Sequence, residues 1–448
     1  MNYRLAEMDC AQARMQVSVG VSAIQAIWLY ERPVDLEQLE RFRESLQHGR
    51  LGRVIAPASI AAAGDRWTTN AHFAPLDVDA HPIARTDLDT WIAERGDAEV
   101  IVYGGPAWRL AVTAIDDGGS AVSLLVSHAI ADGLSVTSAI VEAQSGTRLD
   151  WSFESDGWSR LKLLATDASA SARHIRRVAK LYAGARRSFA AATTAEQGAD
   201  VPAAPAGPTP PPVPTLPSGF RIPRATATIS SEHWHPAAAA RGGSGTTLGV
   251  AIAAELAAQI GRVDADGTAH IAMPFSTRTG VDDRRANAVR GLRLAVPTAG
   301  LSEDLQPLKQ QMKTELTNAT STANPEELAM ATFTALPRFW IARTAWSSVP
   351  ADHSTTVCSV RLGAEPELSN IDGAPAASMS FGLVNRGIED PSRLARFGGC
   401  LGIAMVEVGG LVSVRVSSFH AETVRSSDEL KAVMATVFGR YGLEATFC

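Results

Sequence analysis

A proline-rich stretch near the middle of the chain constrains its architecture more than any other feature. Eight prolines fall between residues 202 and 217, among alanines and small polar residues. Such a segment favours an extended conformation and cannot build a hydrophobic core. We therefore predict a linker at residues 196–220 that joins an N-terminal lobe, residues 1–195, to a C-terminal lobe, residues 221–448.

Length and composition indicate a globular chain with enough apolar residues for two cores. The chain has 448 residues, of which 46% are hydrophobic and 20% are charged, which suits two domains or one double-lobed body. The net charge is −6, and the basic residues are not concentrated enough overall to indicate nucleic-acid binding. The longest early apolar run, residues 17–29, is interrupted by polar residues and is shorter than the roughly 20 apolar residues of a membrane span.

Cysteine usage and the start of the chain predict a cytoplasmic protein. Cys10, Cys358, Cys400 and Cys448 are widely separated and include no Cys-x-x-Cys pair. That spacing is typical of free thiols in a reducing compartment, and it argues against a zinc site or a disulfide framework. The first residues include two acids and no apolar core, so no signal peptide is expected.

Helix and strand patterns alternate in both halves and predict an α/β fold. Helices are expected at residues 35–46, 132–144, 158–191, 246–260, 301–317 and 427–441, with Ser427 as the N-cap of the last. Extended segments or strands are expected at residues 15–30, 98–126, 269–274, 291–297, 400–407 and 411–417, the last two as a hairpin around Gly409-Gly410. The helix at 246–260 is apolar nearly all round, so we expect it to be buried.

An apolar strand that ends at a histidine is the main candidate for chemistry. Residues 120–126 read as a strand after a tight-turn signal at 116–119, with residues 109–115 as the partner strand, and His128 follows it closely. Asp132 and Gly133 come next, where a helix begins and glycine allows a sharp backbone turn. Such a position can hold an imidazole rigidly in a cleft, at a pKa useful near pH 7. The pattern is short, and a structural histidine beside an N-cap aspartate is the alternative.

His128, Asp132 and Gly133 resemble the active-site signature of the CoA-dependent acyltransferase superfamily. That superfamily includes chloramphenicol acetyltransferase, the condensation domains of peptide synthetases and the bacterial wax ester synthase/diacylglycerol acyltransferases. Further segments resemble elements of the last family, in the same order along nearly the whole chain: residues 106–108, 273–278, 287–297 and 398–418.

The resemblance implies a fold and a set of site residues. It implies two chloramphenicol-acetyltransferase-like α/β lobes with a tunnel between them and His128 near its middle. His128 would act as the general base, without a serine or cysteine nucleophile, because the acceptor itself attacks the thioester. Asp132 would turn away from the substrate and pair with Arg278, a structural role. Candidate oxyanion donors are the Gly133 N–H and the region near Ser380.

Two more residues are candidates for lining the substrate site, and the chain departs from the family at several positions. Ser127 stands where the family usually has a first histidine, and it could line the acceptor side. Trp108 is a second candidate, although packing beneath the active-site loop is the simpler interpretation. The family's Asn-Asp pair is replaced by about residues 248–249, and its Asn-Val-Pro-Gly element appears only as residues 359–363.

The resemblance further implies the substrates. We expect acyl transfer from a thioester, with acyl-CoA as co-substrate and no other cofactor, to a hydroxyl of diacylglycerol or a long-chain alcohol. One alternative is a carrier-protein-dependent, condensation-like acyltransferase of secondary metabolism. Another is a catalytically silent lipid-binding or scaffold member. No metal is expected, because His233 and His235 alone in a loop-like segment are poor evidence for one.

A basic segment lies between the two predicted lobes. Residues 160–187 carry eight lysines and arginines against one acid, within the helix expected at 158–191. A solvated helix face is the simpler interpretation. The alternative is a patch that contacts anionic lipid headgroups, which would place a cytoplasmic protein at a membrane surface.

Overall fold

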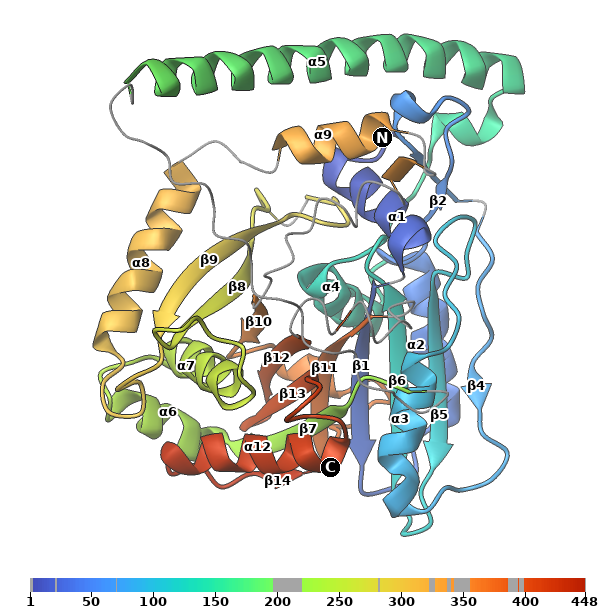
Figure 1. The fold of residues 1–448 in the computed structure, drawn as a ribbon. Helices are drawn as coiled ribbons and strands as arrows, with labels where there is room; N and C mark the ends of the chain where they lie inside the picture. The colour runs from blue at the N-terminus through green and yellow to red at the C-terminus, as the bar shows by residue number, and fades with distance from the viewer. Residues whose placement is uncertain are drawn as a thin grey trace.

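Two main β-sheets form the centre of the molecule, and they lie side by side with helices packed around them (Figure 1). The computed structural model describes residues 3–20, 22–69, 71–195, 220–280, 283–321, 327–336, 340–341, 355–385, 394 and 399–447. Apart from residue 220, the predicted linker lies outside the described residues. None of the described helices is both long and apolar enough to cross a membrane.

The first sheet carries the predicted histidine strand at its centre. Its strand order is β11 (Ser378–Asn385), β1 (Ser22–Tyr30), β6 (Ser120–Ser127), β5 (Trp108–Ala114) and β4 (Asp77–Val78). The central strands are buried on both faces, because helices α2 (Leu36–His48) and α4 (Gly133–Gln144) share one apolar cluster with them and α3 (Leu88–Gly96) shares another. The expected pairing of residues 109–115 with 120–126 across a tight turn is confirmed.

The second sheet is built from strands of the second half of the chain. Its order is β14 (Thr446–Phe447), β7 (Arg224–Ser230), β13 (Leu411–Phe419), β12 (Cys400–Val408), β10 (Thr356–Arg361), β8 (Thr268–Ser276) and β9 (Val289–Pro297). Helices α6 (Ser231–Ala239), α7 (Gly245–Gln259), α8 (Gln306–Ser321) and α12 (Ser427–Arg440) pack around it. As predicted, α7 is buried almost throughout, and the β12–β13 hairpin turns at Gly409-Gly410.

One strand of the second half crosses into the sheet of the first. Strand β11 pairs antiparallel with β1 from Ser22↔Asn385 to Leu29↔Ser378, and it also packs against β12 and β13 of the other sheet. Backbone hydrogen bonds therefore fix the two halves to each other along this strand. Sequence patterns did not indicate this exchange, because pairing partners so far apart in the chain leave no local signal.

Two predicted extended segments, residues 15–30 and 98–126, differ from the structure in their first part. Residues 98–107 contain only an isolated bridge at Tyr103, and strand β5 begins at Trp108. Residues 15–19 were expected to be extended but belong to helix α1 (Glu7–Val19), so only β1 is a strand. This helix buries polar side chains: Arg14 contacts Asp65, and Gln16 donates to the Ser22 carbonyl. Because buried polar residues interrupt the apolar periodicity, the helical pattern is hidden in the sequence.

Two further corrections concern helix boundaries in the second half. The N-cap of α12 is Ser426 rather than Ser427, and it forms a capping box with Glu429. His233 and His235 lie in helix α6 rather than in a loop. Pro236 inside that helix is the residue that made the segment look irregular.

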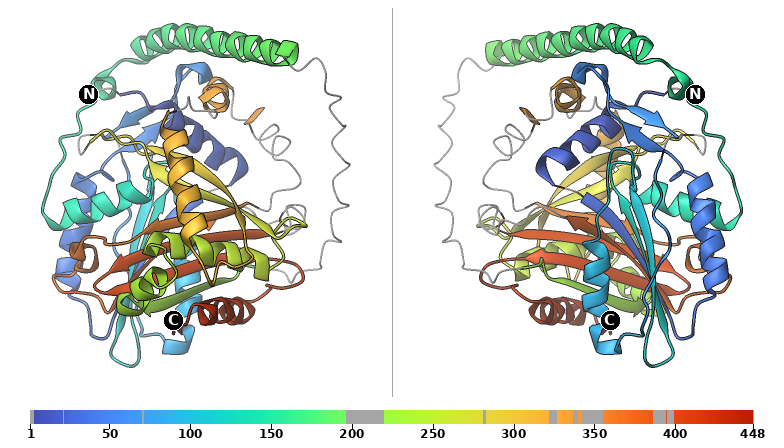
Figure 2. Two further views of the ribbon diagram at one scale, coloured as in Figure 1. Left: turned by 90° about the vertical axis from the view of Figure 1, so that its left-hand side faces the viewer. Right: turned by 90° about the vertical axis from the view of Figure 1, so that its right-hand side faces the viewer.

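The basic segment forms part of helix α5 (Arg160–Ala195), which runs across one end of the molecule (Figures 1 and 2). Its described inner side packs near the short helix Ala61–Ala63 and near α9 (Glu327–Ala335), and it buries Asp167. Leu161 and Ile175 are 79% and 55% exposed among its basic residues. The remaining short strands, β2 (Val54–Ala56) and β3 (Arg66–Thr68), pair with each other.

Candidate active site

His128 sits directly after β6, at a cavity between the two sheets. Its backbone N–H donates to the Ser22 carbonyl over 2.9 Å, which fixes the turn to the neighbouring strand. The side chain is half-buried and lines a cavity of about 460 Å³. The cavity is also lined by Gly133 and Leu134 of α4 and, from the second half, by residues of β8, β10, β11, β12 and β13. The predicted histidine is therefore at the junction of the two halves.

Asn287, from the loop before β9, orients the His128 ring. Its Nδ2 donates to the His128 carbonyl over 3.0 Å, and its Oδ1 lies 2.9 Å from His128 Nδ1. Because the amide nitrogen is directed to the carbonyl, its oxygen must accept a proton from Nδ1. Nε2 is then the unprotonated nitrogen of the neutral ring, and it has no hydrogen-bond partner among the described residues. This is the tautomer that a general base at Nε2 requires.

A buried carboxylate holds the loop that carries Asn287. Asp9 of α1 accepts the backbone N–H groups of Asn287 and Ala286 over 2.6 and 3.2 Å. Burial raises the pKa of Asp9 to about 6, against the lowering effect of these hydrogen bonds and of the nearby Arg53 cation. Arg53 is itself buried, stacked between Trp67 and Trp151 with its Cζ 3.9 and 4.4 Å from the ring centroids. Neither Asp9 nor Arg53 was among the sequence candidates.

Asp132 and Arg278 form an ion pair that joins the two halves behind the histidine loop. Arg278 donates from Nη1 and Nη2 to the two carboxylate oxygens over 2.8 and 3.1 Å, and Asp132 is 1% exposed. Asp132 also caps α4 by accepting from Ser135 N, and it accepts from Ala288 N beside Asn287. The carboxylate is thus saturated by donors of the scaffold, which is the structural arrangement that the resemblance implies for this pair.

Gly133 begins α4 at the edge of the cavity. A Cβ atom added there would meet nothing within 4 Å, so the glycine keeps space open beside His128. The backbone N–H groups in the first turn of a helix have no partner within the helix, and they are available to a negatively charged group. The Gly133 N–H is therefore placed as a candidate oxyanion donor.

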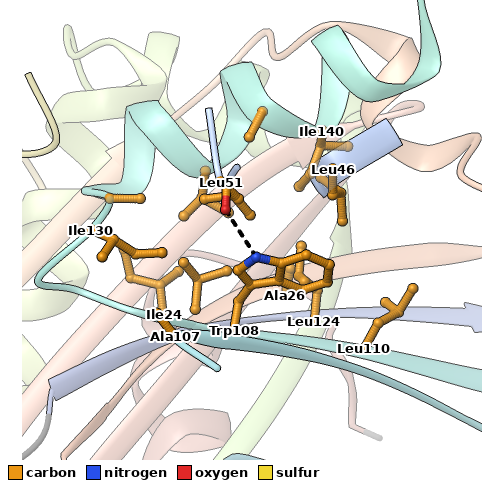
Figure 3. Close-up of a cluster of buried hydrophobic side chains, with 14 of the residues drawn as sticks. Ile24, Ala26, Leu46, Leu51, Ala107, Trp108, Leu110, Leu124, Ile130 and Ile140 are labelled. Carbon is orange, nitrogen blue, oxygen red and sulfur yellow. Dashed lines mark hydrogen bonds between the residues drawn. The ribbon is translucent and has the colours of Figure 1, made fainter. Parts of the chain in front are cut away.

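None of the three residues considered as lining the substrate site belongs to the wall of this cavity. Trp108 is 1% exposed and packs among Leu46, Leu51 and Ile140, with its Nε1 donating to the Leu51 carbonyl over 3.1 Å (Figure 3). Ser127 is fully buried, and its hydroxyl donates to Gln16. Ser380 lies within β11, whose next residues line the cavity instead: Phe381, Gly382 and Leu383.

The other predicted chemistry-bearing residues stay apart from the site. His235 contacts Glu407 over 2.9 Å, and no group of three or more potential metal ligands occurs among the described residues. Cys10 and Cys358 are buried free thiols whose pKa burial raises to about 12, and Cys400 is also free. Cys448 lies outside the described residues.

No protein-family model matches the chain, and no curated protein matches it. Solved structures do match. The first condensation domain of the calcium-dependent antibiotic synthetase, in complex with a substrate analogue, gives a TM-score of 0.54 at 14% identity and covers 98% of this chain and 95% of that one. The chain has the fold of a condensation domain.

Two further condensation structures agree with this fold. A mutant starter condensation domain of rhizomide synthetase RzmA, in complex with C8-CoA and Leu-SNAC, gives a TM-score of 0.51 at 14% identity over 98% of this chain and 94% of that one. The nonribosomal peptide synthetase FmoA3 gives 0.54 at 15% identity over 98% of this chain and only 44% of that one, so the chain spans less than half of that synthetase. None of these three is a wax ester synthase or a diacylglycerol acyltransferase.

Proposed function

We propose that the protein transfers an acyl group from a thioester to a nucleophilic acceptor, with His128 as the general base. The observation that carries this proposal is the oriented imidazole, whose Nδ1 faces Asn287 Oδ1 at 2.9 Å beside a cavity of about 460 Å³. A fixed neutral histidine can take the acceptor's proton at Nε2 and return it to the leaving thiolate. The condensation fold is consistent with this chemistry.

The steps follow from the residues around the cavity. The acceptor's oxygen or nitrogen attacks the thioester carbonyl while its proton passes to His128 Nε2, which gives a tetrahedral oxyanion. The Gly133 N–H would stabilise that oxyanion at the start of α4. Collapse expels the thiolate, which takes the proton from the imidazolium, so the ring returns to its neutral form. The Asp132–Arg278 pair stays outside these steps and holds the loop.

The finer substrate assignment divides into two candidates. Acyl-CoA as donor and diacylglycerol or a long-chain alcohol as acceptor rest on the sequence resemblance alone. A condensation-like acyltransferase with a carrier-bound donor is favoured by the fold and by the charged side chains in the cavity wall: Arg224, Arg361 and Arg415. A silent scaffold would not need an oriented histidine with a free Nε2 at a cavity.

The test measures thiol release from acyl-CoA, acyl-N-acetylcysteamine and carrier-bound donors, each with hydroxyl and amine acceptors. Wild type, His128→Ala and His233→Ala are compared, because His233 is an exposed histidine of α6 far from the cavity. Acceptor-dependent release should vanish in His128→Ala and persist in His233→Ala, with circular dichroism showing that all three are folded. Equal release from His128→Ala, or none from any donor with folded wild type, would refute the proposal.

A further inference from the structure

The wall of the His128 cavity is strongly cationic. Three arginines line it, Arg224, Arg361 and Arg415, and Asp132 is the only acid among the described residues that line it. Asp132 is already paired with Arg278, and Arg361 is paired with Glu365 over 2.6 Å. Arg224 and Arg415 are therefore the arginines of the wall whose charges are least compensated by carboxylates.

Arg415 is the most deeply buried of these cations. It projects from β13, is 4% exposed, and donates through Nη2 to the side-chain oxygen of Gln25. The Gln25 amide nitrogen is committed to the Ile92 carbonyl and the Ser123 hydroxyl, which fixes its oxygen toward the guanidinium. Arg415 Nη1 has no hydrogen-bond partner within the described part of the chain. Among the described residues, the hydrogen-bond partner of this buried cation is thus a neutral amide.

Arg224 adjoins this group from β7. Its Nη2 lies 3.4 Å from Asp97 Oδ1, a long contact, and its Nη1 has no partner among the residues that the structure describes. Burial, together with repulsion from Arg224, lowers the pKa of Arg415 to about 9, against the raising effect of the Asp89 carboxylate. Asp97 also pairs with Arg221, so Arg224 and Arg415 together exceed the negative charge beside them. Burying such cations is costly, and a bound anion would offset that cost.

The backbone around the two arginines is shaped to admit them. A Cβ atom at Gly382 of β11 would lie 2.6 Å from Arg415 Cδ, so glycine is what lets the guanidinium cross from β13 toward the first sheet. A second cavity, of about 230 Å³, shares Arg224, Leu383 and Gly402 with the first and is lined further by Arg262. Arg224 therefore lies where the two cavities adjoin.

We propose that the cavity takes a substrate with an anionic group, most simply a carboxylate, which Arg415 and Arg224 hold while the reacting carbon lies at His128. The inference rests on the proposed acyl transfer and specifies its substrate class. The carboxylate could belong to the acyl chain, as in a dicarboxylic thioester, or to the acceptor, as in an amino or hydroxy acid. A diacylglycerol or a long-chain alcohol offers no such group, so the proposal disfavours both.

Binding tests the inference without any catalysis. Isothermal titration with glutarate and with its neutral diamide is compared in wild type, Arg415→Gln, Arg224→Gln and Arg361→Gln. Arg361→Gln is the matched control, because it removes the same charge from the same cavity where a carboxylate already compensates it. Glutarate should bind wild type at least about tenfold more tightly than the diamide, and Arg415→Gln and Arg224→Gln should lose that preference. The preference should survive in Arg361→Gln.

Turnover then identifies which substrate carries the anion. Glutaryl-CoA is compared with pentanoyl-CoA as donor, and a hydroxy acid is compared with the matching alcohol as acceptor, in wild type and Arg415→Gln. If Arg415→Gln loses the preference for glutaryl-CoA over pentanoyl-CoA, the donor carries the anionic group. If it loses the preference for the hydroxy acid over the alcohol, the acceptor carries it. Glutarate that binds no better than the diamide, or binding unaffected by both Arg415→Gln and Arg224→Gln, overturns the inference. If glutarate binds as expected but no substrate turns over, only the proposed function fails.

Discussion

Removing the Asn287 side chain should uncouple the orientation of His128 from the stability of the fold. Asn287→Ala deletes two hydrogen bonds, of 2.9 and 3.0 Å, that set the ring and its tautomer. The backbone N–H of residue 287 would still donate to Asp9, so the loop keeps its anchor. Each lost bond corresponds to about 0.5–1.5 kcal/mol. If both act in the transition state, kcat/KM should fall roughly 5- to 150-fold.

Asn287→Asp gives a second, opposite signature. A carboxylate at this position still accepts from Nδ1–H, but it favours the imidazolium and raises the pKa of His128. Since the base must be neutral, the acid limb of kcat/KM should move to higher pH by at least about one unit. Asn287→Ala should lower kcat/KM across the pH range without moving its acid limb to higher pH.

The assay is thiol release between pH 5.5 and 9, with ¹⁵N chemical shifts of the His128 ring as an independent reading of its tautomer. Asn318→Ala, on the exposed side of α8, is the control for replacing an asparagine in the second half. Wild type should show the proton on Nδ1. A protonated Nε2 in wild type, or an Asn287→Ala enzyme within twofold of wild type, would refute the role given to Asn287.

Three other perturbations have definite expected outcomes. Asp132→Ala leaves Arg278 buried without its counter-charge and should cost about 3–5 kcal/mol in chemical denaturation; an unchanged stability with abolished activity would favour a direct chemical role. The fold raises the pKa of Asp9 from 3.8 to about 6, so the contribution of this carboxyl to the free energy of unfolding falls as pH rises. Between pH 4.5 and 7.5 the free energy of unfolding of wild type should fall by about 2 kcal/mol relative to that of Asp9→Asn. Parallel curves of unfolding free energy against pH for the two proteins would contradict this. As a solvated face, helix α5 should leave the protein unbound in flotation with anionic vesicles. Binding that Arg173→Glu with Arg176→Glu abolishes would instead establish contact with lipid headgroups.

Local signals were sufficient for most elements of the fold. The helices α2, α4, α5, α7 and α12 and the β12–β13 hairpin follow from periodicity, caps and turn glycines, which act over a few residues. What the sequence could not provide is the pairing of β11 with β1, since strand partners 349 to 363 residues apart share no local pattern. Helix α1 was not predicted for a related reason: its polar residues are buried against partners elsewhere in the fold.

The candidate site divides in the same way. His128, Asp132, Gly133 and Arg278 lie in short recognisable segments, and the structure brings all four together. Asp9 acts on Asn287 through the backbone of a loop 277 and 278 residues away, which no motif records. In the sequence, Asp9 resembles an ordinary exposed acid in the first turn of a helix. Only its burial in the structure indicates a role in the site.

If Arg415 holds the anionic group of the substrate as proposed, the strand exchange sets how far that group lies from His128. His128 follows β6, which is paired with β1, and β1 is paired in turn with β11. Arg415 belongs to β13, against which β11 packs, and Gly382 of β11 is the point where the guanidinium passes. The base and the cation are therefore connected through the β6–β1–β11 ladder and the packing of β11 against β13. Backbone ladders hold their spacing more rigidly than loops do, so the proposed site would select substrates by the distance between the reacting carbon and the anionic group.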